Sequence, residues 1–344
     1  MSAVPEGTIP YLAGRAAQPA ALERITARVA EQLALDAPVS GVREPVFVGI
    51  GASHAALALP VRVLAEYGIA ARRELAGDLG PGPAFARADL VLGVSQSGRS
   101  TETLEALSLV ERERRAALVN LAPSPLSETV AHCVDLGSEP DSYASTVGYT
   151  GTLIGLTMTA RALAGRPLPQ IAAEWAGIGE LLQEQERATG PVVDEIAGRA
   201  AGAVAADVVA SGAALSASEA GALLLREVCR VPATALVTRN YLHGAMESAG
   251  RTLHIVIGDG RELELARTLA DAGHPTLAVT SAPLTAGADL YVARVPGAVS
   301  LPVRTVLETL VLQRLAASLA DTRGVEIEDF VFHNADTKTT QAVA

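Results

Sequence analysis

The sequence has little of what several protein classes need. Its formal net charge is −11 over 344 residues, and this disfavours a general nucleic-acid binder, which presents a basic face. No apolar run reaches the roughly 18 residues needed to cross a bilayer. The N-terminus has no charged segment followed by an apolar one, so we expect a cytoplasmic protein without a secretory signal.

Cysteine, histidine and aromatic residues are also scarce. Two cysteines make no disulfide framework, and six histidines form no HExxH motif. We therefore expect no structural metal and no cofactor. Aromatic residues make up 3% of the chain and hydrophobic residues 49%, so the cores must consist mainly of Ala, Val and Leu.

Lysine is nearly absent. Of 27 basic residues, only Lys338 is a lysine. An amine can form a Schiff base and a guanidinium cannot, so a single retained lysine suggests covalent chemistry. Chance survival in a flexible tail explains the same observation equally well at this point.

Short apolar runs alternate with helical patterns along the whole chain, as in a parallel sheet with crossover helices. We predict an α/β fold with strands at 45–53, 88–98, 116–122, 206–213, 252–260 and 275–281. Helices are expected at 17–34, with Pro19 in the first turn, and at 54–67, 100–113, 143–164, 169–200, 216–229, 261–273 and 301–321.

The pattern restarts half-way, which indicates an internal duplication of one α/β unit. Both 88–107 and 251–269 run from an apolar strand through Gly-Arg into an amphipathic helix. We divide the chain into an N-terminal tail and helix (1–34), a first module (35–168), a helical connector (169–200), a second module (201–325) and a C-terminal tail (326–344).

The strongest local motif is Ser-Gln-Ser-Gly-Arg-Ser-Thr at 95–101, where a strand ends and a helix begins. Ligands of open α/β sheets bind at this edge, and N–H groups at a helix start attract an oxyanion. Ordinary helix capping needs one hydroxyl, whereas four occur here, so we favour an anion site. Arg99 fits a strongly anionic ligand or a solvated surface equally well.

The Gly-Ile-Gly-Ala-Ser-His segment at 49–54 resembles half of a dinucleotide fingerprint. The third glycine position is His54, and no acidic strand end follows, so nicotinamide binding is not expected. Ser53 is better interpreted as a second wall of the anion or sugar pocket.

Glu227 is the carboxylate most suited to catalysis. Ser216 and Glu219 fit a capping box that opens its helix, and Glu219 belongs to the solvated face. Glu227 shares the apolar face with Leu223 and Leu224. Desolvation there would raise its pKa towards the range of a general base; an unseen partner such as Arg230 is the alternative.

Together these segments resemble the sugar isomerase (SIS) superfamily, in particular the isomerase half of glucosamine-6-phosphate synthase and free-standing glucosamine-6-phosphate deaminases and isomerases. The resemblance covers about 17–338. It is carried by GIGAS (49–53), SQSGRSTET (95–103), YASTVGYTGTL (143–153), GALLLREV (221–228), LHG (242–244) and ADTK (335–338).

The resemblance implies two flavodoxin-like αβα modules that bind a phosphorylated sugar. It assigns the phosphate to Ser95, Gln96, Ser97 and Ser100, and the sugar to Ser53 and Ser145. It implies proton transfer between C1 and C2 by Glu227 and a Schiff base at Lys338. It also implies ring opening by His243, contributed by the neighbouring subunit of a homodimer. Without the resemblance, a single histidine is more often a structural or surface residue than a catalytic one.

Some positions depart from the synthase pattern, since Leu224, Ala220 and Val147 replace its charged residues, and aminosugar synthesis is not expected. We predict a phosphosugar aldose–ketose isomerase, with loss of an amine as one variant. A fructosamine-6-phosphate deglycase, a sulfosugar isomerase and a non-catalytic sugar-phosphate sensor are the alternatives.

Overall fold

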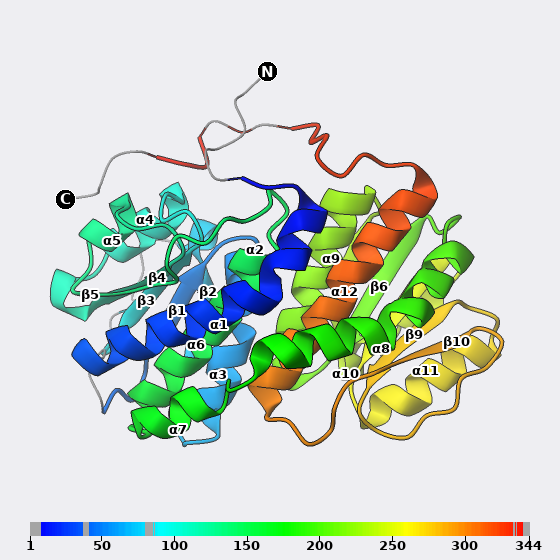
Figure 1. The fold of residues 1–344 in the computed structure, drawn as a ribbon, viewed down its shortest axis with the longest axis horizontal. Helices are drawn as coiled ribbons and strands as arrows, with labels where there is room; N and C mark the ends of the chain where they lie inside the picture. The colour runs from blue at the N-terminus through cyan, green and yellow to red at the C-terminus, as the bar shows by residue number, and fades with distance from the viewer. Residues whose placement is uncertain are drawn as a thin grey trace.

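Two parallel five-stranded sheets form the framework of the chain (Figure 1). The computed structural model describes residues 8–36, 41–79, 85, 87–332, 334 and 336–339. The strands of the first sheet, in spatial order, are β2 (Arg72–Leu75), β1 (Val46–Gly49), β3 (Val91–Ser95), β4 (Arg115–Val119) and β5 (His132–Asp135). Those of the second are β10 (Leu290–Arg294), β9 (Thr276–Thr280), β8 (Thr252–Ile257), β6 (Ala205–Ala210) and β7 (Ala233–Val237).

The two sheets have the same topology. Numbered within each module, both follow the order 2-1-3-4-5, so the predicted α/β class with a duplicated unit is confirmed. In this order the second strand lies on one side of the first strand, and the third strand lies on its other side. Ligands of such sheets bind at that switch point, beyond the carboxyl ends of the strands.

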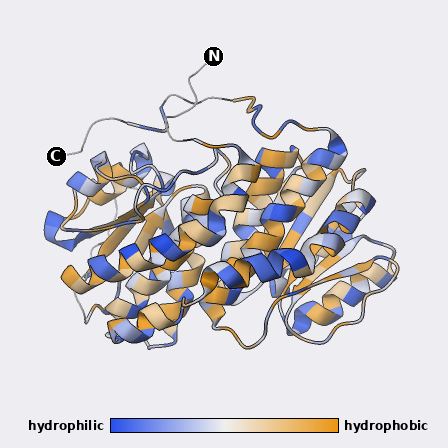
Figure 2. Cartoon of the chain, in the orientation of Figure 1, coloured by the Kyte–Doolittle hydropathy of each residue, from blue (hydrophilic) through white to orange (hydrophobic). Residues whose placement is uncertain are grey.

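Most of the long helices lie between the sheets and share one continuous apolar core. They are α1 (Tyr11–Leu35), α3 (Ala58–Ala65), α6 (Val147–Leu163), α8 (Ile178–Arg199), α9 (Leu215–Cys229) and α12 (Leu301–Arg323). Helices α4 (Thr101–Ser108) and α5 (Pro125–Glu128) cover the outer face of the first sheet; α10 (Thr238–Tyr241) and α11 (Arg261–Asp271) cover that of the second. Figure 2 shows hydrophilic residues on the outward side of α8.

Helix α1 begins earlier than predicted, so Pro19 lies inside it and not in its first turn. Distant contacts extend the helix: the Tyr11 backbone N–H donates to Glu328 (2.9 Å), and its buried hydroxyl donates to the Gln313 carbonyl (3.0 Å). Pro19 has no N–H for the Arg15 carbonyl. The side-chain amide of Gln18 donates to that carbonyl instead, at 3.4 Å.

Several predicted elements differ in detail. The predicted helix 54–67 is two helices, α2 (Ala52–Ala56) and α3, and the predicted helix 169–200 is α7 (Leu168–Ala173) followed by α8. Strands β2, β5, β7 and β10 are absent from the predicted ranges, and all four lie at sheet edges. In the described ranges, no helix combines the length and apolarity that crossing a bilayer requires.

Candidate functional site

The residues 95–100, here called the serine loop, lie at the switch point of the first sheet, between the end of β3 and the start of α4. Ser100 occupies the N-cap position, but its side chain makes no capping hydrogen bond. Its hydroxyl lies 2.9 Å from the Ser95 hydroxyl. Ordinary capping therefore does not explain these serines, and a hydroxyl-lined helix start suits an anion.

The backbone holds the serine loop in one conformation. Gly98 has a φ of +63°, and a Cβ at this position would lie 2.0 Å from the Ser124 hydroxyl. The Asn120 and Leu121 N–H groups donate to the Gln96 carbonyl at 3.0 and 3.1 Å. Only glycine combines this conformation with this close approach, so the loop is preorganised.

The C-terminal residues 336–339, here called the tail segment, bind along the serine loop. The Thr339 N–H donates to the Arg99 carbonyl (2.9 Å), and the Thr101 N–H donates to the Thr337 carbonyl (3.3 Å). Ser100 and Lys338 form the antiparallel bridge between them. The tail segment therefore brings the only lysine of the chain to the predicted anion site.

A cavity of about 270 Å³, here called the serine-loop cavity, opens at this position. Its lining includes Gln96, Ser97, Asp141, Tyr143 and Lys338. Partial burial, followed by the nearby Arg99 guanidinium, lowers the pKa of Lys338, although the residue as a whole remains exposed. A lowered pKa increases the fraction of neutral amine, the form that attacks a carbonyl.

Neither Ser145 nor Ser53 lines this cavity. The Ser145 hydroxyl donates to the Asp141 carboxylate (2.6 Å), which also accepts from the Thr146 N–H (2.9 Å). Ser145 therefore orients a residue of the cavity wall. Ser53 is half-buried in α2, which follows β1 directly and so starts at the same sheet edge as the serine loop.

Glu227 lies near the end of α9 and lines a second cavity of about 440 Å³, here called the Glu227 cavity. Burial raises the pKa of its carboxyl to about 7. Arg230 does not reach it but contacts the Asp329 carboxylate (3.3 Å). Among the described residues, no ion pair neutralises Glu227. A carboxyl group that titrates near neutrality suits a general base.

An aromatic pair separates the two cavities. The rings of Tyr143 and Phe330 have centroids 4.1 Å apart; Tyr143 lines the serine-loop cavity and Phe330 the Glu227 cavity. The pair therefore lies between the cavity that Lys338 lines and the cavity that Glu227 lines. Neither ring was predicted as a site residue, although Tyr143 stands two residues before Ser145 in the segment 143–153.

Two predictions about α9 are wrong. Ser216 does not open a capping box: the helix begins at Leu215, and the Ser216 hydroxyl accepts from the Leu59 N–H (3.0 Å). Glu219 is not a solvated residue, since both of its oxygens bind the Arg73 guanidinium at 2.6 Å. Both partners belong to the first half of the chain, so local spacing could not reveal them.

His243 is exposed and follows α10 in the second module. In Figure 1, α10 lies at the bottom of the molecule, whereas the segment leading to the C-terminus crosses the top. The structure therefore does not bring His243 to Lys338 and Glu227 within one chain.

The corresponding edge of the second sheet contains carboxylates of the chain itself. Glu262 accepts from the Ser211 hydroxyl (2.8 Å) and from the Thr238 hydroxyl (2.5 Å). Asp259 accepts from the Ser281 hydroxyl (2.5 Å) and pairs with Arg304. Hydroxyls at this edge are thus engaged by side-chain anions, and the polar loop of the first sheet remains the candidate ligand site.

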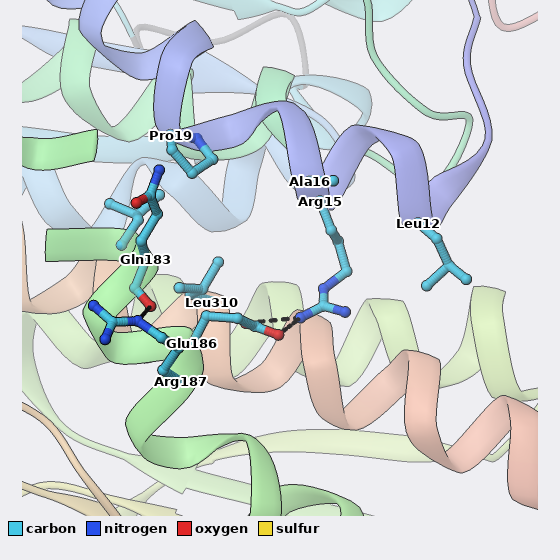
Figure 3. A pocket seen from close by; sticks show the side chains of 9 residues that line it. Leu12, Arg15, Ala16, Pro19, Gln183, Glu186, Arg187 and Leu310 are labelled. Carbon is cyan, nitrogen blue, oxygen red and sulfur yellow. Dashed lines mark hydrogen bonds and ion pairs between the residues drawn. The ribbon is translucent and has the colours of Figure 1, made fainter. Parts of the chain in front are cut away.

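A larger cavity, of about 570 Å³, lies between α1 and α8 (Figure 3). Its lining is mostly apolar, and its central polar contact is an ion pair between Arg15 and Glu186 at 2.7 Å. It contains none of the predicted site residues.

Comparison with solved structures identifies the fold. The C-terminal domain of glucosamine-fructose-6-phosphate aminotransferase from Francisella tularensis matches with a TM-score of 0.79 at 17% identity, over 94% of this chain and 99% of that chain. This chain has the fold of the phosphosugar isomerases. No protein-family model matches it, and no curated protein matches its sequence.

Two further isomerase-fold structures are similar. Glucosamine-6-phosphate deaminase from Thermotoga maritima has a TM-score of 0.72 at 17% identity, covering 97% of this chain and 99% of that one. Tagatose-6-phosphate ketose/aldose isomerase from Escherichia coli has a TM-score of 0.73 at 16% identity, covering 94% and 97%. At these identities the likeness establishes the phosphosugar isomerase fold, as the sequence resemblance predicts, and not the activity.

Proposed function

We propose that this protein is a sugar-phosphate isomerase that moves a proton between C1 and C2 of a hexose 6-phosphate. One observation carries the proposal: the tail segment places the only lysine of the chain in the cavity formed by the serine loop. A hydroxyl-lined helix start suits the phosphate. An amine beside it suits the sugar carbonyl.

In the proposed reaction the sugar binds as a ring and reacts in its open-chain form. Its phosphate accepts hydrogen bonds from Ser95, Ser97 and Ser100 and from N–H groups of the serine loop, while Gln96, Ser53 and Ser145 complete the pocket around phosphate and sugar. In plain isomerisation the Lys338 amine, as ammonium, donates a hydrogen bond to the sugar carbonyl oxygen and polarises it. A lysine imine kept through the C1–C2 proton transfer would end as a stable carbon–nitrogen single bond, so Lys338 forms its imine only with the amino-sugar substrate, at C2 and after that transfer. Positioning supplies a large part of the rate.

Glu227 is the proposed proton carrier. Its carboxylate removes a proton from C2 of the aldose, an enediol or enolamine forms, and the same proton returns to C1. Deprotonated Glu227 is present above about pH 7, because burial raises its pKa to about 7. The Tyr143–Phe330 pair must shift for Glu227 and Lys338 to reach adjacent carbons, since it separates their cavities.

His243 is the proposed ring-opening residue of the partner subunit's site. It is exposed and lies away from the cavity of its own chain, so a homodimer that places it at the partner's Glu227 cavity completes the active site. Such an arrangement makes dimerisation a requirement for turnover.

An amino-sugar 6-phosphate is the preferred substrate class. With an amine at C2, proton transfer yields a ketimine; exchange with the Lys338 amine releases ammonia, and hydrolysis of the lysine imine consumes one water and gives the ketose phosphate. The lowered pKa of Lys338 supports an imine-forming role.

A turnover assay tests the proposal. Glucosamine 6-phosphate, fructose 6-phosphate and glucose 6-phosphate are each incubated with the protein, and ammonia and isomer are measured separately. Isomer formation from at least one substrate supports the isomerase, and stoichiometric ammonia identifies the deaminase variant. Saturable binding of all three without turnover would contradict the proposal and leave a sensor.

A further inference from the structure

A buried polar cluster lies on the outer face of the second sheet, away from the cavities described above. Asp207 on β6 and His254 on β8 are register partners, and Tyr241 of α10 packs over them. The Tyr241 hydroxyl donates to the Asp207 carboxylate (3.1 Å) and lies 3.1 Å from Nδ1 of His254. Tyr241 and His254 are fully buried.

The geometry of this cluster determines which atoms carry the hydrogens. The single hydroxyl hydrogen of Tyr241 goes to Asp207, so Nδ1 of His254 carries a hydrogen and donates to the tyrosine oxygen. Nε2 of His254 is then unprotonated, and this buried atom has no hydrogen-bond partner among the described residues. Burial, and then the nearby His274, lower the pKa of His254 to about 4, which keeps the imidazole neutral.

Such a cluster costs stability on a face that is otherwise apolar, packed with Val209, Val256 and Leu265. A phenylalanine would fill the same space without a polar group. The hydroxyl therefore contributes something other than packing. Buried networks with paired members fix one geometry, and this one fixes the position of α10 against the sheet.

Helix α10 leads directly into the turn that carries His243. The helix has only four residues, and the Leu242 and His243 N–H groups donate back to the carbonyls of Thr238 and Asn240 at 3.2 and 3.0 Å. The His243 side chain is exposed on this turn. Its position relative to the body of the protein is thus set by Tyr241, two residues earlier, and by the bond from Thr238 to Glu262.

We propose that Tyr241, held by Asp207 and His254, is a positioning residue that sets the location of His243 for the partner subunit's active site. The inference rests on the proposed function, in which His243 acts across the dimer. It adds that a buried hydroxyl on one subunit governs turnover in the other.

Mixed dimers test this directly. Two differently tagged chains are co-expressed, and heterodimers are purified through both tags and assayed with the substrate found by turnover. In the reference heterodimer, one chain carries Glu227→Gln and the other carries His243→Asn. Both substitutions then fall in the same site, and the second site keeps Glu227 of one chain and His243 of the other. This heterodimer should recover about half of the wild-type activity per dimer. Failure of this pair to recover activity contradicts the proposed cross-subunit function itself.

Tyr241→Phe is then paired with each of these chains. As a homodimer it should show about a tenfold to hundredfold lower kcat with little change in KM, since a displacement of about 1 Å costs up to this much. Paired with a Glu227→Gln chain, it should recover about half of the activity, because the site that keeps Glu227 takes His243 from the chain with an intact Tyr241. Paired with a His243→Asn chain, it should not, because the only remaining His243 follows the substituted Tyr241. The reverse order, with the reference pair active, would show that Tyr241 acts on its own cavity and would overturn the inference.

Two controls separate positioning from general loss of stability. Tyr149→Phe removes another buried hydroxyl, which donates to the Ser216 carbonyl at 2.7 Å, and should leave kcat near wild type. Asp207→Asn keeps an acceptor for Tyr241 and should retain activity, whereas Asp207→Ala should resemble Tyr241→Phe. Equal loss of activity in the Tyr149→Phe and Tyr241→Phe variants would contradict the proposal.

Discussion

Glu227 shows how a catalytic requirement conflicts with stability at a single residue. Its carboxyl lies on a mostly buried helix, beside a cavity lined by apolar side chains such as Phe330 and by the charged side chains of Arg226, Arg230 and Asp329. Burial raises its pKa from 4.5 to about 7. The unfolded chain therefore loses this proton more readily than the folded chain, and the folded state is penalised wherever the group must ionise.

Replacing Glu227 by Gln should therefore stabilise the protein at high pH. Below pH 4.5 the carboxyl is protonated in both states and carries no penalty; the penalty grows as the pH rises from 4.5 to about 7 and is constant above. We expect Glu227→Gln to gain up to about 3 kcal/mol at pH 8 and almost nothing at pH 4.5. Urea unfolding at both pH values measures this, and an equal gain at both would contradict the assignment.

The same variant should lose activity. A missing general base lowers kcat by about a hundredfold or more. In the wild type, kcat should fall as the pH drops below about 7, because Glu227 becomes protonated. Retention of this acidic limb in Glu227→Gln, or a turnover near wild type, would assign the base elsewhere. Inorganic phosphate binding should be unchanged in the variant.

Lys338 can be tested without interference from other lysines, because the chain has no other. Lys338→Arg keeps the charge but cannot form an imine, and we expect at least about a hundredfold loss of kcat. Borohydride added with an amino-sugar 6-phosphate should give a mass adduct in the wild type and none in the variant. Undiminished turnover in Lys338→Arg would remove the covalent role.

The environment of a residue could be predicted from the sequence where it depends on neighbours in the same helix, and could not be predicted where it depends on distant residues. Glu227 was found because helical spacing places it among leucines, and its raised pKa agrees with that expectation. Glu219 and Ser216 were misassigned because their partners, Arg73 and Leu59, are 146 and 157 residues away. No periodicity within one helix contains that information.

At the scale of elements, the tail segment and the serine loop depend on each other. The serine loop offers a preformed backbone, and the tail segment pairs with it through a short antiparallel bridge. Exposed segments held by few hydrogen bonds open readily. We therefore expect the tail segment to release and reclose, and so to admit and retain a sugar.

Thr339→Pro should detach the tail segment from the serine loop without changing the Lys338 residue itself. Proline has no N–H to donate to the Arg99 carbonyl, a bond of 2.9 Å. We expect kcat to fall by about tenfold or more, because Lys338 is no longer held at the cavity, and phosphate affinity to persist. Thr339→Ala retains the N–H and serves as the matched control; a loss as large in this variant would show that the backbone bond is not responsible.

The central elements of each sheet were predictable, and some edge strands were not. Central strands such as β3 and β8 are buried on both faces and appear as continuous apolar runs. The edge strands β2 (RREL) and β5 (HCVD) are partly exposed and mix charged with apolar residues. The early start of α1 depends on contacts with residues 313 and 328, which no local signal indicates.

At the scale of the whole molecule, duplication of one topology has produced two different sheet edges. The first keeps neutral hydroxyls and an open cavity, whereas the second binds the carboxylates of Glu262 and Asp259. One chain therefore provides one candidate ligand site. In the proposed function, the second module instead contributes His243 to the partner subunit's site.

A dimer requirement predicts that activity depends on concentration. Specific activity should fall on dilution through the range in which sedimentation shows dissociation into single chains, because each chain then lacks the partner's His243. The His243→Asn variant should dissociate over the same range with no activity to lose. Full specific activity in the dissociated protein would contradict a shared site.

The most direct measurement is a crystal structure with a bound hexose 6-phosphate. We predict the phosphate against Ser95, Ser97 and Ser100, with C1 and C2 of the sugar between the Lys338 amine and the Glu227 carboxylate. A sugar phosphate bound elsewhere, or bound to the serine loop with both of those groups out of reach of the sugar, would contradict the account.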